Sequence, residues 1–219
     1  MTAHVRECGD SMLLVEFAAA IDPVTNDRAI ALADGLRARA ARGVCDVVPG
    51  YCTVGVHFDP LQTDLAALEQ AIDAELAGVG TVPAAHLRPV VEIPVRYGGD
   101  EGPDLAAVAA LAGCDTEEVI RRHLSRVYRV YMLGFVPGFA YLGRVDSSIA
   151  APRRRVPRER VPAGSVGIAG EQTGVYPSES PGGWQLIGRT RLRIFDPTRS
   201  SPSLLAAGDA VRFVREQPE

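Results

Sequence analysis

The chain has 219 residues, a formal net charge of -4 and a pI near 5.6, which argue against nucleic acid as its main partner. All 23 basic residues are Arg, so a phosphate-binding loop of the Gly-Lys-Ser/Thr type, a lysine Schiff base and a biotin-carrying lysine are excluded from this chain. No stretch approaches the roughly 20 apolar residues of a membrane span, and the first residues lack the apolar region of a signal peptide. We therefore expect a cytoplasmic protein without membrane contact.

The first part of the chain alternates pairs of strands with single helices. We predict strands at 5–7, 11–17, 44–48 and 53–58, and helices at 23–41 and 61–76. Asp22 is a suitable N-cap and Pro23 a suitable first residue for the first helix, while Leu65, Leu68 and Ile72 recur at helical spacing in the second. This order predicts an α+β sandwich in which helices cover one face of a small antiparallel sheet.

Residues 78–88 are rich in small residues, Gly and Pro, which is typical of a domain junction. We predict an N-terminal α+β domain at 1–85 and a second domain at 86–219. In the second domain we expect helices at 105–111 and 116–124, and strands at 90–97, 127–133, 165–169, 184–187, 192–195 and 210–214. So many short strands indicate a β-barrel or a β-sandwich.

Residues 161–189 combine short apolar runs with closely spaced Gly and Pro, which indicates strands joined by tight turns. Gly at this density also allows a backbone to pass close to a ligand. Ser165 lies in a pattern similar to a nucleophile elbow, but Ala163 replaces the first Gly, and a strand rather than a helix follows. We expect Ser165 to lie in a turn or to hydrogen-bond a ligand rather than to act as a nucleophile.

Residues 152–162 form a proline-stiffened segment with five Arg residues. Such a charge run is either a solvated loop or a site for a carboxylate or phosphate, which guanidinium groups bind in bidentate fashion. We assign a specific role to Arg158 in preference to the run at 153–155.

Phe135 and Phe139 lie in a loop that Gly and Pro constrain. These two rings line a pocket, form an interface with Tyr141 and Trp184, or fill a buried aromatic corner. His123 ends a helix just before this region and is either a surface residue or a general acid–base group. The four Cys and four His residues are dispersed without a pattern of paired ligands, so we predict no metal site.

Several segments together carry a family resemblance. The chain reads HLS at 123–125, YRVYMLGFVPGFAYLG at 128–143, VPAGSVGIAGEQTGVYP at 161–177 and SPGGWQLIGRT at 180–190. With Pro-Arg pairs at 152–153 and 157–158 and Phe-Asp-Pro at 195–197, these segments resemble the family variously named the B subunit of 5-oxoprolinase, allophanate hydrolase subunit 1 and KipI. The resemblance covers nearly the whole chain, although Gly-Arg-Val-Asp at 143–146 departs from the usual Gly-Gly-Leu-Asp.

The resemblance implies a C-terminal cyclophilin-like β-barrel and a homologous partner of similar barrel type, named the C subunit of 5-oxoprolinase or allophanate hydrolase subunit 2. With a third protein, the pair is expected to open 5-oxoproline to glutamate with ATP, which is bound by this chain or by partner subunits. The allophanate name implies hydrolysis of a urea-derived acid instead. The KipI name implies a regulatory protein that inhibits a sensor histidine kinase, and prolyl isomerase activity would rest on fold analogy alone.

Both candidate substrates have an amide carbonyl beside an anionic group, so the site needs an anion clamp and groups that polarise the carbonyl. We predict Arg158 as the clamp, and Gln172 with the backbone N–H groups of the 164–170 loop as polarising groups. The predicted catalytic residues are Arg158, Gln172 and His123, and the predicted substrate-binding residues are Ser165, Gly167, Tyr176, Trp184, Phe135 and Phe139. The sequence offers no convincing nucleophile–base pair, so we expect a partner to complete the site and the chain alone to have little activity.

Overall fold

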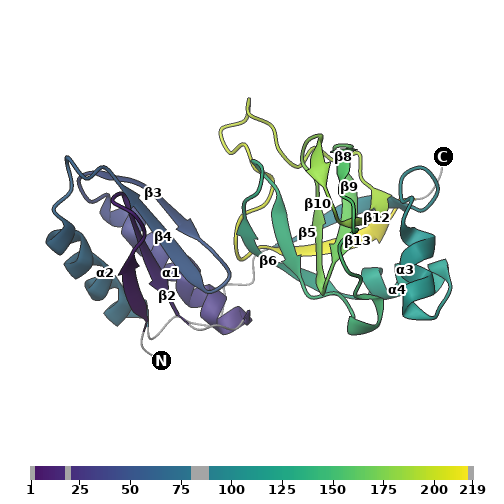
Figure 1. The fold of residues 1–219 in the computed structure, drawn as a ribbon, viewed down its shortest axis with the longest axis horizontal. Helices are drawn as coiled ribbons and strands as arrows, with labels where there is room; N and C mark the ends of the chain where they lie inside the picture. The colour runs from purple at the N-terminus through teal and green to yellow at the C-terminus, as the bar shows by residue number, and fades with distance from the viewer. Residues whose placement is uncertain (1–2, 18–20, 80–88, 217–219) are drawn as a thin grey trace. The chain divides into compact units, whose positions relative to one another are not determined.

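The strands and helices of the computed structural model fall into two units, Met1–Leu87 and Arg88–Glu219 (Figure 1). The structure describes residues 3–17, 21–79 and 89–216. The predicted domain boundary between residues 85 and 86 lies outside the described residues and stays a prediction.

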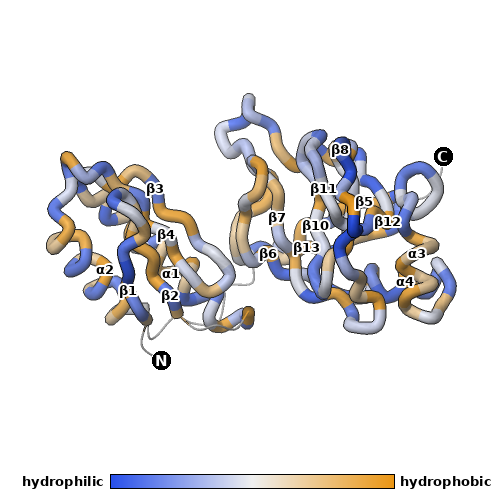
Figure 2. The backbone as a smooth tube through the Cα atoms, in the orientation of Figure 1, coloured by the Kyte–Doolittle hydropathy of each residue, from blue (hydrophilic) through white to orange (hydrophobic). Residues whose placement is uncertain are grey.

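The N-terminal unit is a four-stranded antiparallel sheet with two helices, as the sequence predicts. Its elements are β1 (His4–Glu7), β2 (Met12–Glu16), α1 (Pro23–Arg39), β3 (Val44–Pro49), β4 (Thr53–Phe58) and α2 (Leu65–Val79). The strand order is β1-β2-β4-β3, and Figure 2 shows the edge strand β1 as hydrophilic and the inner strands β2 and β4 as hydrophobic. Leu13 and Val15 of β2 are fully buried in one core with Leu32 of α1 and Ile72 of α2, so the core lies between the sheet and its helices.

Local capping sets where these two helices begin. Asp22 accepts a hydrogen bond of 2.9 Å from the Thr25 N–H, and α1 begins at Pro23 as predicted. The second helix begins at Leu65 rather than at residue 61, because Asp64 accepts from the Ala67 N–H at 3.2 Å in the manner of an N-cap. Leu61 is exposed in the preceding turn.

The second unit contains a closed β-barrel, which confirms the predicted α+β class and the barrel alternative. Its elements are β5 (Val90–Tyr97), α3 (Leu105–Ala112), α4 (Thr116–Leu124), β6 (Val127–Leu133), β7 (Ala140–Gly143), η1 (Ser147–Ile149), β8 (Arg158–Val161), β9 (Ser165–Ala169), β10 (Gln172–Val175), β11 (Ser180–Gly182), β12 (Gln185–Arg189) and β13 (Ala210–Arg215). The barrel order is β10-β7-β6-β13-β5-β12-β9, and β11 pairs with β8 in a separate two-stranded sheet. Within the barrel, β13 and β5 are parallel, and the other described neighbours are antiparallel.

The barrel interior is filled by apolar side chains from strands far apart in the sequence. Fully or almost fully buried examples are Ile93, Val95, Val130, Leu142, Ile168, Val211 and Phe213. The helix α4 adds Val119 and Ile120 to this core. It begins where predicted, because Asp115 accepts a hydrogen bond of 2.7 Å from the Glu118 N–H.

The predicted strand at 192–195 is wrong. The Leu192 N–H donates to Thr190 Oγ1, and the Thr198 N–H donates to Asp196 Oδ1, at 3.1 Å each. These side-chain contacts turn the chain locally, and only an isolated bridge joins Phe195 to Ser203. None of the helices in the described part of the chain is long and apolar enough to cross a membrane.

Candidate functional site

An aromatic pocket on the barrel unit brings together four of the predicted substrate-binding residues. The cavity has a volume of about 260 Å³ and is lined by Phe135, Phe139, Tyr141, Arg153, Pro157, Tyr176, Pro181, Gly182, Gly183 and Trp184. The contributing segments are the loop before β7, strand β7 itself, the arginine-rich segment before β8, and strand β11 with the turns on either side of it. The sequence interpretation of the aromatic loop as part of a pocket therefore agrees with the geometry.

Phe139 is the centre of this pocket. Its ring centroid lies 4.9 Å from that of Tyr141, 5.2 Å from that of Tyr176 and 5.4 Å from that of Trp184, all in edge-to-face arrangements. Phe139 is 1% exposed, whereas Phe135 at the rim is 61% exposed. The pocket thus has a rigid buried wall and one aromatic ring that faces solvent.

The glycine at position 174 allows the rings to lie directly on the barrel wall. A Cβ atom there would lie 3.2 Å from Phe139 Cζ and 3.3 Å from Trp184 Cζ3. Such contacts are closer than ordinary packing permits, so a side chain at this position would displace one of the two rings.

Phe135 adopts a backbone conformation that is unusual for a residue with a side chain. Its φ is 71°, and the Val136 N–H donates to the Gly134 carbonyl at 2.9 Å, which closes a three-residue turn around it. Left-handed backbone in a bulky residue is strained, and such strain is common where a side chain must be presented to a ligand or partner. This turn places the Phe135 ring at the mouth of the pocket.

Arg153 supplies the positive charge of the pocket lining. The described residues contain no carboxylate in an ion pair with it, and its side chain is exposed. Burial raises the pKa values of Tyr141 and Tyr176 above their ordinary range, while the charge of Arg153 partly opposes this rise. Both phenols therefore stay protonated at neutral pH and are hydrogen-bond donors beside a cation.

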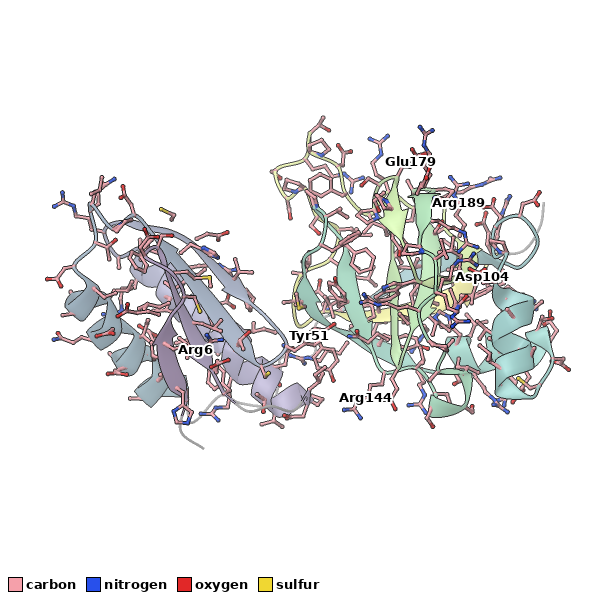
Figure 3. All side chains as sticks on the ribbon, viewed as in Figure 1. Arg6, Tyr51, Asp104, Arg144, Glu179 and Arg189 are labelled. Atoms are coloured by element: carbon pink, nitrogen blue, oxygen red, sulfur yellow. The ribbon has the colours of Figure 1, made fainter. Side chains whose placement is uncertain are left out.

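Arg158, the predicted anion clamp, is instead paired with Asp104. Its Nη1 and Nη2 atoms each lie 2.8 Å from an Asp104 carboxylate oxygen. Arg154 Nη1 and the Leu186 N–H also donate to the Asp104 carboxylate, at 3.0 Å and 2.7 Å. Asp104 is labelled in Figure 3. This arrangement compensates the Arg158 charge and favours a structural role for it.

Asp104 anchors the segment beside the candidate site, and the sequence pattern did not indicate this role. It precedes α3, where an acidic residue suggests an ordinary N-cap, but its side chain makes no cap hydrogen bond. Burial alone would raise its pKa, but hydrogen bonds from Arg158 and the Leu186 N–H, with the charges of Arg158 and Arg154, lower the pKa below its ordinary value. The carboxylate therefore stays ionised and holds the arginine segment against the barrel.

His123 lies in the barrel core rather than at the surface or in the aromatic pocket, and it is 0% exposed. Thr173 Oγ1 donates to the Gly167 carbonyl at 3.0 Å, so it accepts from His123 Nε2 at 2.9 Å. His123 Nδ1 then accepts from the Tyr97 hydroxyl at 2.8 Å. Burial lowers the pKa of His123 to about 3, so the ring is neutral at ordinary pH. This geometry favours a structural role over general acid–base catalysis.

The predicted polarising groups lie in the barrel wall. Ser165 and Gly167 belong to β9, whose backbone pairs with β10 on one side and with β12 on the other. Gly164 and Gly170 at the ends of the segment donate their N–H groups to the Tyr176 and Ala151 carbonyls. Gln172 pairs in β10 with Gly143 and Ala169 and is not part of the pocket lining. Because these N–H groups are already hydrogen-bonded to backbone carbonyls, they do not form an oxyanion site in the pocket.

We also searched the described residues for a group of side chains that could bind a metal ion. No group of three or more His, Cys, Asp or Glu side chains there is arranged to hold a metal ion. Cys8, Cys45, Cys52 and Cys114 are free thiols.

A family model described as carboxyltransferase domain, subdomain C and D, matches residues 3–205 of the chain. The chain belongs to this carboxyltransferase-domain family. One relative, the B subunit of 5-oxoprolinase from Bacillus subtilis (strain 168), is 41% identical over 222 residues, which cover 97% of this chain and 92% of the relative.

The chain is also similar to solved structures. TTHA0988 is 38% identical with a TM-score of 0.84, and the match covers 99% of this chain but 41% of TTHA0988, so this member of the family spans less than half of that protein. The Kluyveromyces lactis urea carboxylase is 21% identical with a TM-score of 0.75, over 98% of this chain and 22% of its own. At 21% sequence identity, the similarity to urea carboxylase is evidence for a shared fold alone.

Proposed function

We propose that this chain is one subunit of a heteromeric, ATP-dependent enzyme that opens 5-oxoproline to glutamate, acting with a homologous barrel-type subunit. The observation that carries the proposal is the 41% identity to the B subunit of a bacterial 5-oxoprolinase, over nearly the full length of both chains. Hydrolysis of allophanate is the second substrate assignment within the same proposal, because both compounds pair an amide carbonyl with an anionic group.

The aromatic pocket fits a small, flat substrate with one negative charge. Its volume of about 260 Å³ suits a small ring or a short linear amide, and its walls are aromatic faces and edges. Arg153 takes the place of Arg158 as the proposed carboxylate clamp, since it lines the pocket and has no carboxylate partner among the described residues. The protonated hydroxyls of Tyr141 and Tyr176 are the proposed donors to the amide carbonyl.

The pocket as described needs a partner to carry out the reaction. Its described lining contains no Ser, Thr, Cys, His, Asp or Glu side chain, so it offers no aliphatic hydroxyl, no thiol, and no carboxylate or imidazole base. The phenols of Tyr141 and Tyr176, whose pKa values burial raises, stay protonated and therefore have no base beside them to activate them. We propose that the barrel-type subunit supplies these groups, and that ATP is bound there or shared with a third component. This arrangement accounts for the expectation that the chain alone has little activity.

Co-expression with the barrel-type subunit tests the proposal. The complex should be isolated and supplied with the third component and ATP, and glutamate release from 5-oxoproline should be measured. Arg153→Ala should raise KM at least about tenfold, because a charge-assisted bond to the substrate is lost. The control Arg155→Ala removes an equal charge outside the pocket and should leave KM within about twofold.

Three results would contradict the proposal in different ways. Turnover by the isolated chain would show that the site is complete without a partner. Turnover of allophanate but not of 5-oxoproline would move the substrate assignment. Tight binding to a sensor histidine kinase, with no stable complex and no turnover, would replace the enzyme with the regulatory alternative.

A further inference from the structure

A second cavity, of about 490 Å³, lies on the barrel unit and shares no lining residue with the aromatic pocket. It is formed by the end of β5, the loop before α3, the turn before β9, and the segment that continues from β12. Its charged lining residues are Arg96, Arg189, Arg191, Arg193 and Glu101. Four of these five charged side chains are cationic.

Two of these arginines are held in fixed positions. Arg189, which Figure 3 labels, donates from Nε to the Ala163 carbonyl at 2.8 Å, and its Nη1 lies 3.5 Å from Glu101 Oε2. Arg96 Nη2 lies 3.1 Å from Glu216 Oε1. Guanidinium groups that are already oriented lose little entropy when an anion binds between them.

The other two arginines lie on the turn that follows β12. Arg193 Nη1 lies 3.2 Å from Asp196 Oδ2, and the Leu192 N–H donates to Thr190 Oγ1, so the turn has a defined shape. Arg191 is exposed, and the structure records no ion pair for it within residues 3–17, 21–79 and 89–216. Its charge is the one in the cavity that no described carboxylate compensates.

Thr190 adds a buried donor to these cations. It lines the cavity, is 3% exposed, and accepts from the Leu192 N–H through Oγ1 at 3.1 Å. A hydroxyl has one hydrogen to donate, and no acceptor for the Thr190 hydroxyl hydrogen is recorded in the described part of the chain. A ligand oxygen in the cavity would satisfy this donor.

We propose that this cavity, with Arg189, Thr190 and Arg191 as its central residues, binds the phosphate group of a small anionic ligand. A phosphate monoester carries about -1.5 to -2 charges and three acceptor oxygens at neutral pH, which matches several guanidinium groups and one hydroxyl better than a single carboxylate does. The chain contains no Lys, so any phosphate that it binds must be held by Arg and by neutral donors. The proposal does not depend on the function proposed for the aromatic pocket.

Calorimetric titration of the full chain tests the proposal. Inorganic phosphate is the first probe, ADP and phosphoserine are nucleotide and non-nucleotide phosphate esters, and malonate is the carboxylate comparison. Phosphate should bind saturably, and Arg191→Ala should weaken it at least about tenfold, because the uncompensated cation is lost. Arg155→Ala, which removes an equal charge outside both cavities, should change the affinity by less than about twofold. Arg191 is exposed and has no ion pair within the described ranges, so its variant should keep the melting temperature of the parent protein.

The outcomes separate the alternatives. A preference for ADP over phosphoserine would identify the phosphate as part of a nucleotide, and the reverse preference would identify a phosphorylated small acid; either supports the site. Malonate that binds as tightly as phosphate, with the same loss in Arg191→Ala, would overturn the phosphate assignment. An equal loss in Arg155→Ala would show diffuse attraction to the basic surface and no site. Because binding is read without turnover, failure here is distinct from failure of the proposed enzyme activity.

Discussion

Asp104 and Arg158 are 54 residues apart in sequence, and two hydrogen bonds of 2.8 Å join their side chains. Asp104 also accepts from Arg154 and from the Leu186 N–H. The arginine-rich segment that these bonds hold includes Arg153 and Pro157 of the aromatic pocket. One buried carboxylate at the start of α3 thus positions the charged rim of the candidate site.

Asp104→Asn should lower the free energy of unfolding of the barrel unit by about 2–3 kcal/mol. The loss is smaller than for a fully buried pair, because the Arg154 and Arg158 side chains keep 36% and 22% exposure. Urea unfolding followed by Trp fluorescence measures it, since Trp184 is the only Trp of the chain and lies in this unit. Glu159→Gln, an exposed acid in the same segment, is the control and should have little effect; equal losses in the two variants would remove the anchoring role of Asp104.

The buried His123 makes the stability of the barrel unit depend on pH. Its pKa in the folded protein is about 3, against an ordinary value of 6.5, because burial disfavours the charged ring. Between these values the unfolded chain binds a proton that the folded barrel excludes, so the free energy of unfolding falls as pH decreases below 6.5. The slope reaches about 1.4 kcal/mol per pH unit, and above the ordinary pKa the contribution is fully present.

Urea unfolding by Trp fluorescence should be measured between about pH 6.5 and 4.5, where this dependence is steep. Glu118, Asp146 and Asp196, whose hydrogen bonds lower their pKa values to about 2, lose their contributions mainly below this interval. NMR titration of the His123 ring gives an independent readout, which should show no protonation down to about pH 4.5. A titration midpoint near the ordinary value of 6.5 would contradict the buried neutral ring.

The starts of α1 and α4, which neighbouring residues set, could be predicted, whereas two of the shortest strands could not. The Asp22 and Asp115 caps act within one turn, so the starts of α1 and α4 follow from the sequence. Strands β7 and β10 are four residues each and gain their definition by pairing with each other across about thirty positions. The sequences of β7 and β10 each contain one Gly and are flanked by Gly and Pro, so their local pattern favours a loop.

The candidate site shows the same division. Its aromatic residues stand out because large rings in a loop rich in Gly and Pro are unusual, and Phe135, Phe139, Tyr176 and Trp184 do line one pocket. The choice between Arg158 and Arg153 depends on Asp104, which packing rather than local sequence brings to one of them. The basic segment could therefore be recognised, but which of its arginines lacks a described carboxylate partner could not.

Gly174→Ala should destabilise the barrel unit by about 1–3 kcal/mol and disturb the pocket. The new methyl group would lie 2.9 Å from the Ala140 carbonyl oxygen and against the Phe139 and Trp184 rings, so a ring or a strand must shift. Urea unfolding measures the loss, and the emission maximum of Trp184 reports movement of its ring. Gly134→Ala is the matched control, because only the flexible Met132 Cε lies near its new methyl group. An unchanged emission maximum together with full stability in Gly174→Ala would contradict the close ring packing.

The strained backbone at Phe135 predicts an inverted ranking of two substitutions. Phe135→Gly relieves the left-handed φ of 71°, whereas Phe135→Ala keeps a Cβ atom and removes the same ring contacts. The Gly variant should therefore be more stable than the Ala variant by about 1 kcal/mol, although Gly normally costs stability through unfolded-state entropy. Val156 is an exposed position without a positive φ, and there the Gly variant should be no more stable than the Ala variant. Both Phe135 variants lose the exposed rim ring and should raise KM in the reconstituted complex. An Ala variant as stable as the Gly variant would show that the turn at Phe135 carries no strain.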